Sequence, residues 1–244
     1  MATEKPWPRW QSLHVVKAGN GPAEYEDAFA ANPARARFAV GASEASFAAN
    51  WARLLAQGFI DAPDPGTDLD WLAPARLRWS AEVDGLPVPW YAEAKREMGA
   101  YATLLGVAFS VPTPDRQRAW RAVAVGDSCL FHTREGRLLA SFPLSRSDDF
   151  GNAPQLIGSR PSPNGTGGSQ DAGGSWCPGD RFLLMTDALA QWFLHEVEKG
   201  GQAPAEVAAV LAEPDPQASF PAWVEARRAS GLRNDDITLL VIDL

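Results

Sequence analysis

Apolar residues along the chain follow two different periods, and the changes between them mark the predicted elements. Alternating or β-branched runs in WQSLHVV and YEDAFAANPARARFAV, separated by the turn sequences KAGNGP and NPA, predict short strands. Over residues 43–60 the period becomes helical, with Ser43 as the expected N-cap. The apolar face of this helix carries Phe47, Trp51, Leu54, Leu55 and Phe59. We therefore expect an amphipathic helix that lies on a sheet.

The middle of the chain is predicted to be mostly strands. DAPDPGTDLDWLAP, residues 61–74, predicts a loop, PWYAEAKREM a short helix, and GAYATLLGVAFSV a largely buried strand. RAWRAVAVGDSCLFHTREGRLLASFPL contains three short strands separated by the turn sequences GDS and REG. Consecutive hairpins imply that these three strands pair antiparallel as a meander.

The last third of the chain combines a polar excursion with helices and two apolar strands. Residues 158–180 are dense in Gly, Ser and Pro, which predicts a mobile surface excursion and not a domain boundary. RFLLMTD predicts a buried strand, ALAQWFLHEVEKGG a helix closed by Gly200, PAEVAAVLAE and FPAWVEARRAS two more helices, and DDITLLVIDL a final strand. This order favours an α+β fold with antiparallel sheets and helices packed outside, in one domain over residues 1–244.

Composition narrows the class of protein. The formal charge of −8, with no local run of Lys and Arg, argues against nucleic acid and anionic membrane surfaces as partners. No stretch of about 18 apolar residues or signal-peptide pattern occurs, so we expect neither a membrane span nor export. Cys129 and Cys177 lack the spacing of a zinc site and are too few for a disulfide framework, which predicts free thiols and a cytoplasmic location.

Acidic residues lie beside predicted strand ends in four places. They are Glu26 and Asp27 in YEDAF, Asp127 in VGDS, Asp187 in LLMTDA, and Asp235 with Asp236 in RNDDITLL. Carboxylates gathered at one sheet edge repel one another unless a hard cation lies between them, and oxygen-only clusters suit Mg²⁺ or Mn²⁺. A single Asp beside a turn is more often a turn former than a ligand. Asp187 needs a cation or donor more than the others, because it follows a buried strand.

Other catalytic chemistries have little support in the sequence. His14, His132 and His195 are isolated, no G-x-S-x-G elbow occurs, and neither cysteine has an adjacent base. The glycines of NGTGGS do not follow a strand and open a helix, so they do not form a phosphate cradle. The acidic residues are therefore the main candidates for function.

Six stretches of the chain form an ordered set of motifs: YEDAF, RFAVGASEAS, GAYATLLGV, RAVAVGDSCLFHTREGRLLASFPL, RFLLMTDALAQWF and RNDDITLLVIDL. Over about residues 12–244, this set resembles the bacterial metal-dependent protein phosphatases of the PPM (type 2C) family. The resemblance implies a four-layer α-β-β-α sandwich of two antiparallel sheets flanked by antiparallel helices. It also implies hydrolysis of phosphoserine and phosphothreonine in proteins by a water that two Mn²⁺ or Mg²⁺ ions activate. A phosphoprotein would be the substrate, and a Ser/Thr kinase a further candidate partner.

The resemblance also assigns roles to the acidic residues. Asp187 in TDA and Asp235 in DDIT match direct metal ligands of the family, with Asp236 beside the second as a further candidate. Asp27, with Glu26 as a second candidate, matches the acidic end of the N-terminal motif, which usually holds a metal through water. Asp127 in GDS resembles the Asp that serves a weaker third metal.

RFAVGASEAS departs from the family pattern. Family members of this branch read like FAVADGASEAS, where the Asp bridges both metals and the Gly carbonyl contacts one. Gly41 matches that Gly, Val40 stands at the Asp position, and two residues are absent. The family's phosphate-binding Arg is also not evident before YED. Glu44 is a candidate substitute, although an acidic residue at a helix start ordinarily interacts with the helix dipole.

Three hypotheses follow. The first is a Mn²⁺- or Mg²⁺-dependent Ser/Thr phosphoprotein phosphatase, with activity impaired by the missing Asp, because two dications without a shared anionic ligand repel each other. The second is a catalytically inactive phosphatase-like module that binds a phosphoprotein or another partner. The third is an α+β domain whose acidic turns are only structural.

Overall fold

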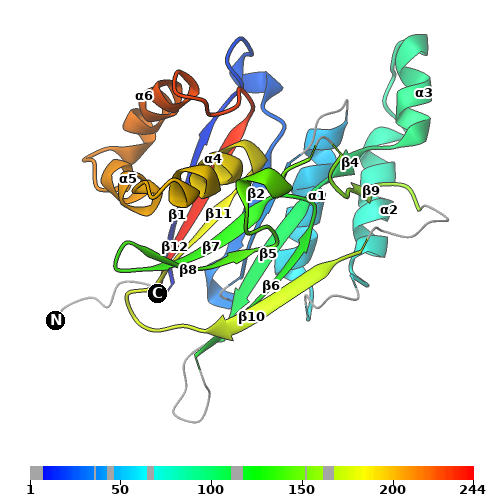
Figure 1. Ribbon diagram of the computed structural model, residues 1–244. Coiled ribbons are helices and arrows are strands. Elements are labelled where there is room, and N and C mark those ends of the chain that lie inside the picture. The colour runs from blue at the N-terminus through cyan, green and yellow to red at the C-terminus, as the bar shows by residue number, and fades with distance from the viewer. Residues whose placement is uncertain are drawn as a thin grey trace.

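Two five-stranded antiparallel sheets form the centre of the molecule (Figure 1). The computed structural model describes residues 8–35, 37–42, 47–64, 69–110, 118–151, 153–161 and 168–244. The first sheet has the order β1 (Arg9–Val15), β12 (Ile237–Asp243), β11 (Arg181–Met185), β7 (Cys129–Arg134) and β8 (Arg137–Phe142). The second has the order β10 (Gln170–Ser175), β6 (Ala119–Val125), β5 (Leu104–Phe109), β3 (Arg37–Gly41) and β2 (Ala28–Asn32). β4 (Tyr101–Ala102) and β9 (Ile157–Gly158) form a small separate pair.

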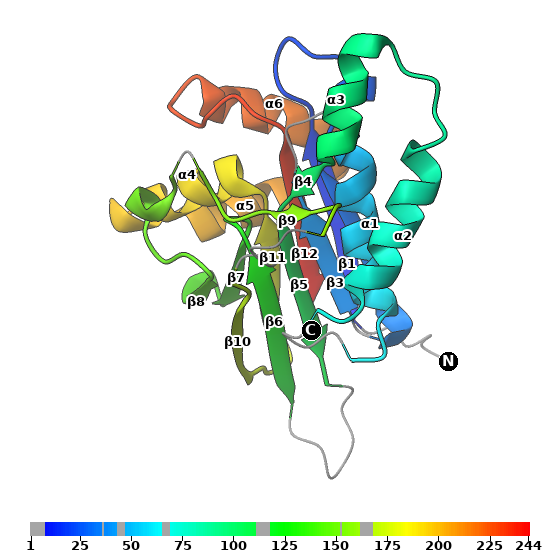
Figure 2. The ribbon, with the colours of Figure 1, turned by 90° about the vertical axis from the view of Figure 1, so that its right-hand side faces the viewer.

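Helices cover the outer face of each sheet. α1 (Ala48–Asp61) and α2 (Leu72–Val83) lie on the second sheet, and α4 (Asp187–Glu198), α5 (Ala203–Leu211) and α6 (Pro216–Arg228) lie on the first (Figures 1 and 2). α3 (Trp90–Met98) extends beyond the end of the sandwich. Of the helices in the described residues, none is long and apolar enough to cross a membrane.

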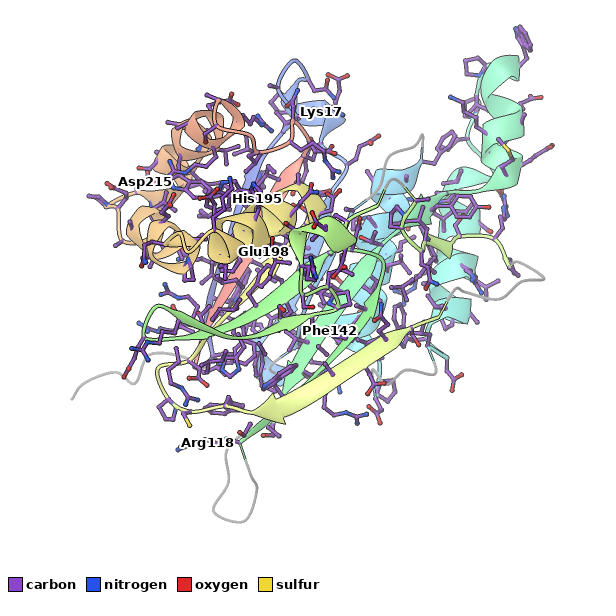
Figure 3. All side chains as sticks on the ribbon, viewed as in Figure 1. Lys17, Arg118, Phe142, His195, Glu198 and Asp215 are labelled. Carbon is purple, nitrogen blue, oxygen red and sulfur yellow. The ribbon has the colours of Figure 1, made fainter. Side chains whose placement is uncertain are left out.

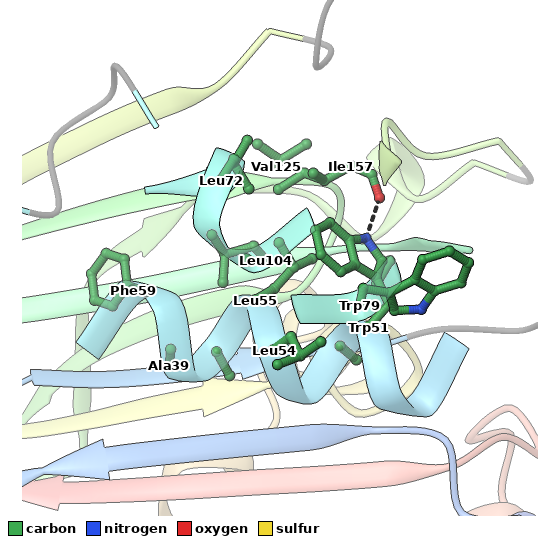
Figure 4. Packing of buried hydrophobic residues seen from close by; sticks show 14 of the residues in the cluster. Ala39, Trp51, Leu54, Leu55, Phe59, Leu72, Trp79, Leu104, Val125 and Ile157 are labelled. Atoms are coloured by element: carbon green, nitrogen blue, oxygen red, sulfur yellow. Dashed lines mark hydrogen bonds between the residues drawn. The ribbon is translucent and has the colours of Figure 1, made fainter. Parts of the chain in front are cut away.

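Three apolar clusters fill the spaces between these four layers. One joins α1 and α2 to the second sheet, one joins α4, α5 and α6 to the first sheet, and one lies between the two sheets. In the first cluster, the buried Trp51 packs beside Leu55 and donates its Nε1 proton to the Ile157 carbonyl at 2.7 Å (Figure 4). The α-β-β-α sandwich implied by the sequence resemblance is therefore confirmed.

The predicted three-stranded meander is wrong at its first turn. β7 and β8 form the expected hairpin, but β6 pairs with β5 and β10 in the other sheet. The sequence GDS therefore carries the chain from one sheet to the other. Gly126 adopts a φ of +107°, and a Cβ there would lie 2.5 Å from the Thr103 side chain, so the crossing requires glycine.

Three further predictions on elements need correction. α1 begins at Ala48, with Phe47 as its N-cap, and not near Ser43, which lies outside the described residues. The predicted loop over residues 61–74 ends at Trp71, because Leu72 opens α2. The predicted surface excursion over residues 158–180 contains β10, an edge strand paired with β6 from Gln170 to Ser175.

Candidate metal and phosphate site

Acidic residues from four segments meet at one end of the sandwich. The segments precede β2 and β12 and follow β6 and β11, which places all four at the same end of the antiparallel sheets. They line a cavity of about 980 Å³, whose acidic residues are Glu24, Glu26, Asp27, Asp127, Asp187, Asp235 and Asp236. Two basic residues, Lys17 and Arg233, line it as well, and Figure 3 shows Lys17 at this end. The structure thus brings together the acidic residues predicted from sequence except Glu44, which lies outside the described residues, and their binding of a metal stays a prediction.

Asp187 and Asp235 share one cationic partner. Asp187 is the first residue of α4, where the helix dipole favours negative charge, and its Oδ2 forms an ion pair with the Arg233 guanidinium. Asp235 Oδ2 lies 3.7 Å from Arg233 Nε, and Asp235 Oδ1 lies 3.8 Å from Lys17 Nζ. The cation that the position of Asp187 required is therefore supplied by Arg233.

Asp236 fixes the segment that leads into β2. Its Oδ1 accepts the backbone N–H of Lys17 at 2.7 Å, and its Oδ2 accepts that of Glu26, also at 2.7 Å. Charged acceptors of this kind make strong hydrogen bonds. With both oxygens engaged by the backbone, Asp236 positions the cavity wall and holds Glu26 and Asp27 beside β12.

Asp27 is buried and accepts a 2.7 Å hydrogen bond at Oδ2 from Thr238 Oγ1. The Tyr25 hydroxyl contacts the same Thr238 oxygen. Burial raises the pKa of Asp27 to about 7, against the opposing effect of hydrogen bonds from Thr238 and Thr186. The same burial, with the nearby Asp27 charge, raises the pKa of Tyr25 above its ordinary value. Asp27 therefore takes up a proton near neutral pH in this arrangement.

The end of β3 supplies no carboxylate. Val40 is fully buried and belongs to the cluster between the two sheets, while Gly41 is buried next to Thr103 and Ala52. Ala42 lines the cavity and pairs with Thr103, donating its N–H to Thr103 Oγ1 at 3.0 Å. Glu44, the predicted substitute, lies outside the described residues. The structure thus shows an apolar side chain where the resemblance implies the bridging ligand.

The chemistry of these donors suits a hard cation, but their arrangement does not form a complete metal site. The Arg233 guanidinium stands in for a cation between Asp187 and Asp235, and carboxylate oxygens are the ligands that Mn²⁺ and Mg²⁺ prefer. Within the part of the chain that the structure describes, no three His, Cys, Asp or Glu residues are placed to hold a metal ion together. A second ion would also lack a shared anionic ligand at Val40.

Sequence reasoning missed the groups that neutralise and orient the carboxylates. Arg233, Lys17 and Thr238 were not predicted as site residues, although Arg233 lies two residues before the Asp pair in RNDD. A basic residue so close to predicted metal ligands was the available signal. Lys17 gave no such signal, because its contact with Asp236 joins residues 219 positions apart.

Comparison with known proteins supports the fold. No family model matches the chain, and no curated protein does. Among solved structures, the PPM Ser-Thr phosphatase MsPP from Mycobacterium smegmatis, in complex with cacodylate, has 21% sequence identity and a TM-score of 0.59, with 97% of this chain and 98% of that chain covered.

Two further structures agree. The catalytic domain of the serine/threonine phosphatase PstP, with two manganese ions, has 17% identity, a TM-score of 0.58 and 97% coverage of both chains. PppA, described as a key regulatory component of T6SS in Pseudomonas aeruginosa, has 19% identity, a TM-score of 0.57 and 97% coverage of both chains. The chain therefore has the fold of the PPM-type Ser/Thr protein phosphatases.

Proposed function

We propose that this chain is a metal-dependent Ser/Thr phosphoprotein phosphatase with severely impaired activity, and that phosphorylated Ser or Thr segments of proteins bind at the acidic cavity. The carrying observation is that acidic residues from four segments meet in that cavity in a PPM-type fold, while Val40 faces the core. Its solved neighbours are PPM Ser/Thr phosphatases, one of them with two manganese ions, which supports the reaction class.

Asp187 and Asp235 are the residues that would hold a Mn²⁺ or Mg²⁺ ion. Such an ion supplies, when bound, a Lewis acid that lowers the pKa of a bound water and offsets phosphoryl charge. We assign Asp27, Asp127 and the Gly41 carbonyl supporting roles around it. Asp236 holds the cavity wall through the Lys17 and Glu26 N–H groups instead of facing an ion.

We extend the proposal to partners and location. A Ser/Thr kinase would produce the phosphoprotein substrate, and both proteins would meet this chain in the cytoplasm. The state of the cysteines supports a reducing compartment, since Cys129 is buried, Cys177 is exposed, and both are free.

The test is hydrolysis of a phosphothreonine peptide with and without millimolar Mn²⁺. We expect slow turnover that requires Mn²⁺ and is abolished in Asp187→Asn. The matched control is Asp171→Asn, which removes a carboxylate from the exposed edge strand β10 and should leave turnover unchanged. Turnover that persists in Asp187→Asn, or that does not respond to Mn²⁺, would contradict the proposal.

A second candidate is a non-catalytic module that binds phosphoprotein. The ion pairs of Arg233 and Lys17 with Asp187 and Asp235 favour this candidate, because they neutralise part of the negative charge of the cavity without any metal. In EDTA, this candidate predicts that the phosphothreonine peptide binds more tightly than its unphosphorylated form. Equal affinity for the two peptides would exclude it.

A further inference from the structure

Arg233 occupies a position between two cavities. It lines the acidic cavity and also a second cavity of about 280 Å³, whose other lining residues include Asp148, His195 and Glu196. His195 lies on α4, as Figure 3 shows, and Asp187 is the first residue of the same helix. The Arg233 side chain is 42% exposed, so its guanidinium is not held in a buried network.

We infer that Arg233 is a tethered internal cation that competes with divalent metal for Asp187 and Asp235 and so sets the metal affinity of this chain. The inference rests on the proposed function, because it concerns the same two carboxylates. Its basis is that one guanidinium contacts both residues, through an ion pair with Asp187 Oδ2 and a 3.7 Å approach of Nε to Asp235 Oδ2.

The competition has two physical parts. A side chain attached four residues before the start of β12 stays at high local concentration next to the carboxylates, so an ion from solution must displace it. A guanidinium that is still nearby repels an arriving dication, although the partial exposure of all three side chains weakens this repulsion.

The second cavity contains other carboxylates that a displaced Arg233 side chain could contact. The second cavity presents Asp148, whose side chain is 86% exposed, and Glu196, whose side chain is 27% exposed. Asp148 lies 3.6 Å from Arg146 and Glu196 lies 3.7 Å from Lys199. Because the second cavity is lined by both carboxylates and by Arg233, we infer that they can share the guanidinium once a metal displaces it. The exchange transfers the charge of Arg233 from one carboxylate set to another.

The test is calorimetric titration of the full chain with MnCl₂, at fixed ionic strength and without phosphopeptide. Arg233→Gln removes the charge and keeps a hydrogen-bonding side chain, and we expect its Kd for Mn²⁺ to be at least about tenfold lower than that of the wild type. Arg233→Lys should bind Mn²⁺ about as weakly as the wild type. Arg137→Gln, which removes the same charge from the exposed start of β8, is the matched control.

Site identity is checked by adding Asp187→Asn to Arg233→Gln, which should reverse the gain. A Kd in Arg233→Gln equal to that of the wild type, or equal to that of Arg137→Gln, would overturn the inference. The absence of Mn²⁺ binding in all variants at millimolar concentration would overturn it too. The titration measures no turnover, so it is independent of the peptide-hydrolysis assay. Tight Mn²⁺ binding by Arg233→Gln would support this inference even if the wild type showed no hydrolysis and the proposed function failed.

Discussion

Replacing Val40 by aspartate should damage the fold instead of restoring a metal ligand. Val40 is fully buried, and it faces the cluster between the two sheets together with Phe38 and Leu105. The substitution puts a carboxylate into that apolar space. The cavity lies beyond the end of β3, where Ala42 and not Val40 is part of the lining.

The destabilisation can be estimated from burial. Losing the apolar burial of Val40 costs about 2 kcal/mol. A carboxyl group buried without a partner has its pKa raised by roughly 3 to 5 units, so the folded protein holds it protonated at pH 7, which adds about 4 kcal/mol at that pH. The sum is comparable with the whole free energy of unfolding of an ordinary domain, about 5 to 15 kcal/mol. We therefore expect Val40→Asp to be largely unfolded at pH 7.

Urea unfolding followed by circular dichroism is the assay, at pH 7 and near pH 4.5. A raised pKa in the folded state makes the penalty grow as pH rises above the unfolded value near 4, so Val40→Asp should regain stability at the lower pH relative to the wild type. Val40→Ala controls for lost packing and should show no such pH-dependent difference. If Val40→Asp stayed within about 1 kcal/mol of Val40→Ala at pH 7, the assignment of Val40 to the core would be refuted.

Two further predictions concern stability away from the cavity. Burial alone raises the pKa of Asp180, but hydrogen bonds from Arg134, the Cys177 N–H and His132 outweigh this effect and hold the pKa at about 2. The resulting stabilisation of the folded state, about 2 kcal/mol at neutral pH, should be lost as pH falls from about 4 to 2. Asp180→Asn should remove this acid dependence of urea unfolding. A Cβ at Gly106 would lie 2.5 Å from the buried Phe59 ring, so Gly106→Ala should cost about 1 to 3 kcal/mol, whereas Gly85→Ala, with nothing within 4 Å, should be near neutral; equal melting temperatures would contradict this.

Elements with strong periodicity could be predicted from sequence. The apolar stripe of α1 and the continuous apolar run of β12 both correspond to buried surfaces. α2 was not predicted, although its buried residues Leu72, Ala75, Trp79 and Val83 lie at helical spacing and Pro74 suits a first helical turn. β10 could not be predicted, since Gly173 and Gly174 have little strand propensity and the strand exists through its pairing with β6.

The candidate site, like the fold, could be predicted from the sequence only in part. Carboxylates at strand ends were visible in sequence because each lies next to an apolar run, and antiparallel topology then places them at one end of the sandwich. The crossing of β6 and β7 into different sheets was not visible, since the local sequence GDS suits a hairpin equally well. The ion pair of Lys17 with Asp235 and the hydrogen bond from its N–H to Asp236 both join residues more than 200 positions apart, which local patterns do not encode.

Strand register shows where a restored carboxylate would lie. Val40 pairs with Leu105 in β5, and Gly41 pairs with Ala28 in β2. Inserting Ala-Asp between Val40 and Gly41 would continue β3 by two residues and place the new Asp opposite Asp27 and beside Thr103. Val40 precedes the insertion and keeps its pairing, and an insertion of two residues also keeps Gly41 on its original face of the strand.

Hydrolysis of a phosphothreonine peptide by this insertion variant tests the central claim most directly. With Mn²⁺, we expect the rate to rise at least about a hundredfold over the wild type, which corresponds to roughly 2.7 kcal/mol of transition-state stabilisation. An Ala-Asn insertion has the same backbone length without the charge and should leave the rate near that of the wild type. A rate unchanged by the Ala-Asp insertion, in a variant that folds and binds Mn²⁺, would contradict the claim that the missing carboxylate at the end of β3 limits this site.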